Sequence, residues 1–171
     1  MPAVAKPKMI NCEPWSLSEI LEKEKDLVGI YLSAHPLDGF QFEMNHYQFM
    51  PLGDLDGAKF KNRVLRLAGY IDNPQHLVSK KGTNYGRFKL IDYHGEQEFT
   101  LFKDDYIKFR DFMVKDNKVM ISGMFQSRWN SETEFEFKIQ RILLLENVKA
   151  QLTKKINIEL TLQRLNDEVL D

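Results

Sequence analysis

Hydrophobic positions follow two different periods along the chain. Between residues 17 and 31 apolar residues recur at helical spacing around a charged stretch. Ser16 and Glu19 have the spacing of a capping box, in which each side chain satisfies a free amide of the other residue at a helix start. The pattern predicts one amphipathic helix that begins after Ser16 and ends before Pro36. A second short helix is predicted over 37–47.

Beyond residue 61 the pattern changes to short strands and turns. Gly69 predicts a bulge or bend in the first strand, and residues 73–84 predict a polar loop. His94 and Gly95 predict a tight hairpin turn. A helical pattern over 103–114 interrupts the strands. The predicted strands cover 64–71, 85–93, 96–102, 118–126 and 134–145.

This element order predicts the fold class: a mainly β protein with flanking helices. Three strands, a helix and two further strands form the five-stranded Greek-key barrel of the OB-fold, here preceded by an N-terminal helical segment. A general α+β fold is the alternative. The predicted organisation is a flexible leader (1–14), a helical linker segment (15–58), the OB-fold domain (59–148) and a C-terminal extension (149–171), with a further strand at 156–162.

The phenylalanines predict part of the core of this barrel. Most of them lie on the predicted strands or on the helix at 103–114, where packing inside the domain explains them. The residues expected to pack there are Phe99, Phe102, Phe109, Phe112, Phe135 and Phe137.

The charges are unevenly distributed. The chain has 24 basic and 25 acidic residues, for a net charge of −1. Residues 59–89 hold eight basic residues and one acid, Asp72, so this segment carries +7 and the rest −8. One interpretation is a surface that binds the phosphates along a nucleic-acid backbone. The other is a solvated sheet face whose basic side chains pair with acidic residues elsewhere in the chain.

Composition excludes several classes of protein. The single cysteine, Cys12, rules out an internal disulfide framework and a multi-cysteine zinc site. The four histidines are dispersed, so we expect neither a metal site nor a cofactor. No apolar run approaches the roughly 20 residues of a membrane-spanning helix. We expect a cytoplasmic protein with no membrane contact.

Residues 22–38 resemble a motif of the bacterial DNA polymerase III alpha subunit. They read EKEKDLVGIYLSAHPLD, close to the pattern E-K-E-x-L-G-x-Y-L-S-G-H-P-L-D that leads into the C-terminal OB-fold region of that family. Ala34 replaces the usual glycine, and one extra residue precedes Leu27. The resemblance continues in the same order through 67–71, 80–82, 100–102 and 119–123.

The resemblance implies a DNA-directed DNA polymerase as the parent protein. The catalytic aspartates of that family lie far upstream, so we expect no catalytic site in this chain. The implied partners are the rest of the alpha chain, the sliding clamp and the clamp-loader tau subunit. The clamp-binding peptide is not recognisable in residues 1–15, and 156–171 resembles the opening of the domain that contacts tau.

The predicted binding site combines cations with aromatic rings, which single-stranded nucleic acid requires for its phosphates and bases. It lies on the second strand, on the loop before that strand and on the turn between the last two strands. In relatives, an aromatic or aliphatic residue is usual where Arg87 stands, and threonine where Lys89 stands. Alternatively, Tyr85 pairs across strands and Trp129 packs on the barrel rim. The predicted residues are Lys80, Lys81, Tyr85, Arg87, Lys89, Arg128 and Trp129.

We therefore expect a non-catalytic module that holds single-stranded template DNA during replication. The alternative is a protein-interaction or spacer module of the replisome without direct DNA binding. A third hypothesis is the anticodon-binding barrel of a class II aminoacyl-tRNA synthetase. The motif at residues 22–38 argues against it, because that enzyme has no reason to carry it.

Overall fold

The computed structural model describes residues 13–128 and 133–155, which divide into two compact units, one up to Gly39 and one from Phe40. The predicted leader up to residue 12, Trp129 and the segment 156–171 lie outside the described residues.

The first unit contains the predicted amphipathic helix, α1 (Leu17–Val28). The capping box is confirmed, because the Glu19 amide donates to Ser16 Oγ at 3.4 Å and the Ser16 amide donates to Glu19 Oε2 at 2.8 Å. The helix ends before Pro36, as predicted, but it ends at Val28, so Tyr31 lies outside it although it continues the helical spacing. Gly29 adopts the left-handed region, with φ of 84°, and its amide donates to the carbonyl of Lys25, which closes the last turn.

Glu24 holds the chain that follows α1 against the helix. Its Oε2 accepts from the amides of Leu32, at 2.7 Å, and Ser33, at 2.9 Å, and its Oε1 accepts from Ser33 Oγ. These hydrogen bonds, the Ser33 hydroxyl first, favour the charged carboxylate and hold the pKa of Glu24 below its ordinary value of 4.5.

Acid should therefore release this loop. Because the folded pKa of Glu24 is lowered, its contribution is fully present above pH 4.5 and is lost as the pH falls through the folded value. We expect the amide resonances of Leu32 and Ser33 to titrate below pH 4.5 in NMR spectra. Glu24→Gln should abolish this titration, and a midpoint at or above 4.5 would contradict the assignment.

In the second unit, short helical turns precede the sheet. They are η1 (Asp38–Phe40), which begins in the first unit, α2 (Gln41–His46) and η2 (Leu52–Asp54). The second short helix predicted over 37–47 is thus confirmed.

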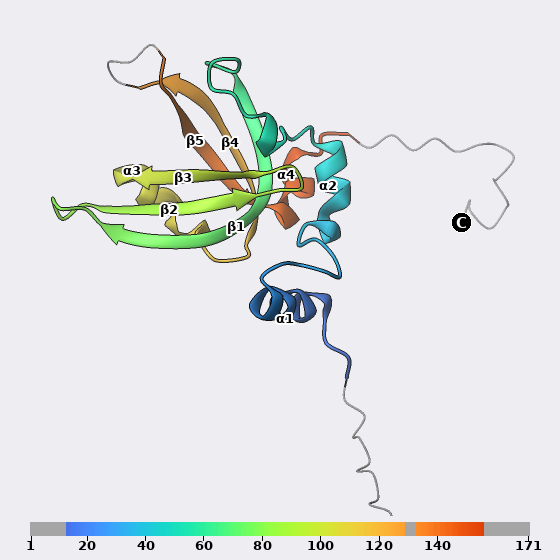
Figure 1. Ribbon diagram of the computed structural model, residues 1–171. Coiled ribbons are helices and arrows are strands. Elements are labelled where there is room, and N and C mark those ends of the chain that lie inside the picture. The colour runs from blue at the N-terminus through green and yellow to red at the C-terminus, as the bar shows by residue number, and fades with distance from the viewer. Residues whose placement is uncertain (1–12, 129–132, 156–171) are drawn as a thin grey trace, which may run out of the picture. The chain divides into compact units, whose positions relative to one another are not determined.

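Five antiparallel strands form one sheet in the order β3-β2-β1-β4-β5. The strands are β1 (Val64–Val78), β2 (Asn84–Ile91), β3 (Glu96–Phe102), β4 (Lys118–Ser127) and β5 (Phe135–Leu144). The curved strand β1 is shared: its first half pairs with β4 and its second half with β2, and Tyr70 pairs with both (Figure 1).

The predicted fold class is confirmed as a mainly β protein with flanking helices. The order and the helix α3 (Lys103–Phe109) between β3 and β4 fit an OB-like barrel. Among the described residues, β3 and β5 form the two edges of the sheet and do not pair with each other. The rings of Phe99 on β3 and Phe137 on β5 are in contact across this opening, with centroids 5.6 Å apart.

The predicted polar loop over 73–84 is wrong in its extent. β1 continues to Val78 and pairs with β2 up to Asn84, which leaves only residues 79–83 as the loop. The strand passes Pro74, which has no amide to donate, through a register shift between Asp72 and Gln75. Gly69, the predicted bulge, stays in register with Val119, and a Cβ there would lie 2.5 Å from the carbonyl oxygen of Ile91.

The core lies inside the curved sheet and is closed by α3 and the following turn η3 (Arg110–Phe112). Phe88 and Leu90 on β2 are fully buried, as the strand alternation predicts. Tyr106 and Phe109 of α3 pack into the same cluster. No helix of residues 13–128 or 133–155 has the length and apolarity needed to cross a membrane.

The segment after β5 is joined to α2. It forms η4 (Leu145–Asn147) and α4 (Val148–Leu152). Lys149 Nζ lies 2.9 Å from Oε1 of the buried Glu43 and 4.9 Å from the ring centroid of Phe42. Tyr47 and Thr153 share a hydrogen bond of 2.6 Å between their hydroxyls.

Candidate nucleic-acid interface

A cleft of about 640 Å³ lies on the β2–β3 face, between the β1–β2 loop and the ends of β4 and β5. The OB-fold binds its ligands on the equivalent face and loops. The residues lining the cleft include Lys80, Tyr85, Arg87, Glu98, Thr100, Phe102, Phe125, Arg128, Phe135, Glu136 and Phe137.

The cleft brings together four of the predicted site residues: Lys80, Tyr85, Arg87 and Arg128. Lys81 follows Lys80 in the exposed loop but is not among the lining residues. Within the described part of the chain, neither lysine has an ion-pair partner. A ligand phosphate can therefore reach either loop lysine without displacing a carboxylate.

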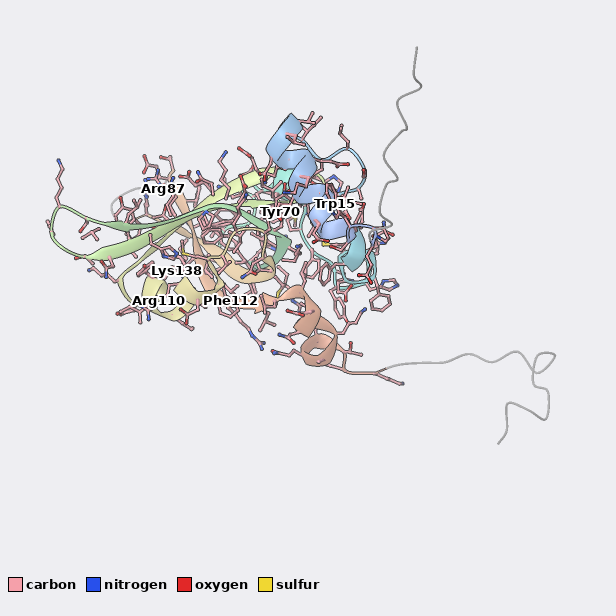
Figure 2. The ribbon with its side chains drawn as sticks, turned by 90° about the horizontal axis from the view of Figure 1, so that it is seen from below. Trp15, Tyr70, Arg87, Arg110, Phe112 and Lys138 are labelled. Atoms are coloured by element: carbon pink, nitrogen blue, oxygen red, sulfur yellow. The ribbon has the colours of Figure 1, made fainter. Side chains whose placement is uncertain are left out.

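The two cations of β2 are paired across the sheet. Arg87 lies at the outer surface (Figure 2), with its Nε 3.5 Å from Oε1 of Glu98. Lys89 Nζ lies 2.7 Å from Oε1 of Glu96, and this hydrogen bond raises the pKa of Lys89. Lys89 does not line the cleft, so its predicted contact with a ligand has no support from the geometry.

The β4 end of the cleft carries Arg128. Its Nη1 lies 3.4 Å from Oε2 of Glu134, and its amide donates to the Glu134 carbonyl at 2.9 Å. Both side chains are exposed, so the pair is weak and a phosphate can compete for the guanidinium. The neighbouring Trp129 lies outside the described residues.

Tyr85 stacks on Phe102 of β3, with ring centroids 5.7 Å apart and an interplanar angle of 23°. This contact confirms the cross-strand pairing that was the alternative role for Tyr85. Phe102 was predicted in the core, but it is 53% exposed. The two residues are direct partners in the hairpin register, so the half-buried ring of Tyr85 and the exposed ring of Phe102 form one two-ring surface.

Sequence reasoning assigned Phe135 and Phe137 to the core alone and gave Phe125 no role beyond its place on a strand. Phe125 and Phe137 are half-buried and in contact, with centroids 5.1 Å apart, and Phe135 lies beside them in the lining. The hairpin register could have identified Phe102, which lies opposite Tyr85. Nothing in the sequence pattern places β5 beside β3. Only the tertiary structure therefore shows that Phe135 and Phe137 line the cleft.

The cleft offers cations and rings, without a constellation for metal-dependent chemistry. Within residues 13–128 and 133–155, no three histidine, cysteine or acidic side chains are grouped to hold a metal ion. Its charge is also more balanced than the +7 segment suggests, because Glu98 and Glu136 line it beside the cations. Lys80, Arg87 and Arg128 remain the positive groups inside it.

Comparison with known proteins finds relatives of this chain among DNA polymerase III alpha subunits. No protein-family model matches it. DNA polymerase III alpha subunits match most of its length: that of Pasteurella multocida is 28% identical over 84% of the chain, and that of Escherichia coli K12 is 24% identical over 94%. The subunit from Borreliella burgdorferi is 24% identical over 90%.

The chain spans only about 12–14% of the length of these relatives. The matches run through both the N-terminal motif and the sheet, because they cover about nine-tenths of the chain. The predicted resemblance to the bacterial DNA polymerase III alpha subunit is therefore confirmed, and the matches are consistent with a fragment of its C-terminal region.

Proposed function

We propose that this chain is a non-catalytic module of a replicative DNA polymerase and that its cleft holds single-stranded template DNA. The observation that carries the proposal is the convergence of Lys80, Arg87 and Arg128 with the partly exposed Tyr85–Phe102 stack in one cleft. Binding of single strands requires this combination, in which cations follow the backbone and rings stack on bases.

The similarity to DNA polymerase III alpha subunits supports single-stranded DNA as the ligand. In this proposal the parent chain carries out polymerisation, and this module keeps the template extended. The rest of the alpha chain is then its permanent partner, with the sliding clamp and the tau subunit as further partners of the parent.

The affinity should be modest and sensitive to salt. Glu98 and Glu134 pair with two of the three cleft cations, so a phosphate must displace a carboxylate to reach Arg87 or Arg128. Lys80 and Lys81 need no such exchange, which makes the loop lysines the largest electrostatic contributors. For single strands, log K falls with log salt by about 0.7 for each phosphate contact.

Removing the two loop lysines tests the proposal. We expect Lys80→Ala/Lys81→Ala to weaken binding of fluorescein-labelled oligo(dT) by about tenfold at about 50 mM salt. The slope of log K against log salt should become less steep by about 1.4, or about 0.7 for each lost phosphate contact. Fluorescence anisotropy titration measures both. Lys89→Ala should have a smaller effect, because Glu96 already pairs with this lysine.

Lys154→Ala/Lys155→Ala is the matched control. It removes the same charge from exposed residues that follow α4, far from the β1–β2 loop (Figure 1). Absence of binding in the parent sequence, or equal losses in the two double variants, would overturn the proposal.

A further inference from the structure

Three cations that do not line the cleft lie on the segment leading into β1. They are Lys59, Lys61 and Arg63, with only Phe60 and Asn62 between them. All three are exposed. No carboxylate of the described residues forms an ion pair with any of them.

This segment is fastened to the β4–β5 wall of the cleft. The Asn62 amide donates to the carbonyl of Phe125 at 2.9 Å, and Lys61 forms a parallel bridge with Phe125. A Cβ at Gly57 would lie 2.6 Å from the Cβ of Phe135, so the backbone passes directly over that residue. Phe125 and Phe135 both line the cleft.

The ammonium group of Lys61 lies 5.6 Å from the centroid of the Phe135 ring, which puts it at the cleft rim. Lys59 and Arg63 lie on the ring of Phe60, 5.3 and 5.7 Å from its centroid. Asp56 is the nearest acid in sequence, and its Oδ1 already accepts from the amides of Ala58 and Lys59. Lys61 thus lies at the rim, and Lys59 and Arg63 lie beside it in the chain on the ring of Phe60.

We infer that Lys59, Lys61 and Arg63 form a second phosphate-binding track, which receives the nucleic-acid strand where it leaves the cleft past Phe135. This inference rests on the proposed function of the cleft. It assigns the ligand class as the sugar-phosphate backbone of a single strand that is longer than the cleft itself. OB-folds bind roughly 4–16 nucleotides, so a short strand fills the cleft and a longer one reaches the track.

Oligonucleotide length separates the two surfaces. The test variant is Lys59→Gln/Lys61→Gln/Arg63→Gln, in which glutamine keeps polar bulk and removes charge. Its matched control is Lys115→Gln/Lys154→Gln/Lys155→Gln, which loses three exposed charges elsewhere in the same unit. Binding of (dT)4 and (dT)12 is measured by anisotropy, directly and by competition, at several salt concentrations.

We expect the test variant to lose about tenfold in affinity for (dT)12, with a salt slope flatter by about 2, and to bind (dT)4 like the parent sequence. Retained (dT)4 binding also shows that the cleft is folded. The track is refuted if the test variant and the control bind (dT)12 equally while Lys80→Ala/Lys81→Ala weakens it. Equal losses for both lengths would place these cations in the cleft and refute a separate track. If the parent sequence binds neither oligonucleotide, the proposed function fails, and the track with it.

Discussion

Phe88→Ala should lower the free energy of unfolding by about 3–5 kcal/mol, the largest single loss of stability that we expect in the sheet. Phe88 is fully buried at the centre of β2, where its ring lies 5.6 Å from that of Phe99. Truncation removes apolar contacts and leaves a cavity under the strand that carries Tyr85 and Arg87. Urea unfolding followed by circular dichroism measures the change.

Phe102→Ala is the matched control for this stability measurement. It removes the same atoms from the neighbouring strand, but the ring is 53% exposed, so the expected cost is about 1 kcal/mol or less. Equal losses for the two variants would show that Phe88 does not occupy the core or that Phe102 does.

The second large effect concerns oligo(dT) binding, in which Phe102→Ala, the mild variant for stability, should cause a large loss. Tyr85→Ala and Phe102→Ala should each weaken oligo(dT) binding by about 1–3 kcal/mol, or roughly five- to 150-fold, if each ring stacks on a base. The two rings stack on each other, so their effects should be less than additive in the double variant.

A matched pair of substitutions separates stacking from shape. Tyr85→Phe keeps the ring and should bind like the parent sequence, whereas Tyr85→Leu keeps apolar bulk without the ring and should bind weakly. Anisotropy titration at constant salt gives both values. Unchanged affinity in Tyr85→Leu would rule out base stacking at this position.

The sequence allowed the order of elements to be predicted, because each has a local cause. Ser16 and Glu19 start α1 through contacts three residues apart, and alternation turns Phe88 and Leu90 inward. These signals depend only on residues that are close in the sequence, so they can be interpreted without knowledge of the tertiary fold. The apolar period continues to Tyr31, past the end of α1 at Gly29, where the backbone turns left-handed, so the period alone does not locate the end of the helix.

The charge pattern could not be interpreted in the same way. Counting along the chain grouped Arg87 and Lys89 with the loop lysines into one +7 segment, but their nearest charges are Glu98 and Glu96 on the next strand. The hairpin register decides that pairing. Lys61 was counted in the +7 segment but was not assigned to a binding site, because its position beside Phe135 depends on how β1, β4 and β5 pack together.

The join between α2 and α4 has a mechanical consequence. Glu43 with Lys149, and Tyr47 with Thr153, tie the segment that enters the sheet to the segment that leaves it. Tension applied between residues 40 and 155 meets these side-chain contacts before it reaches the strands. A pull on both ends of this segment would therefore load the contacts of α2 with the chain after β5 ahead of the sheet that forms the cleft.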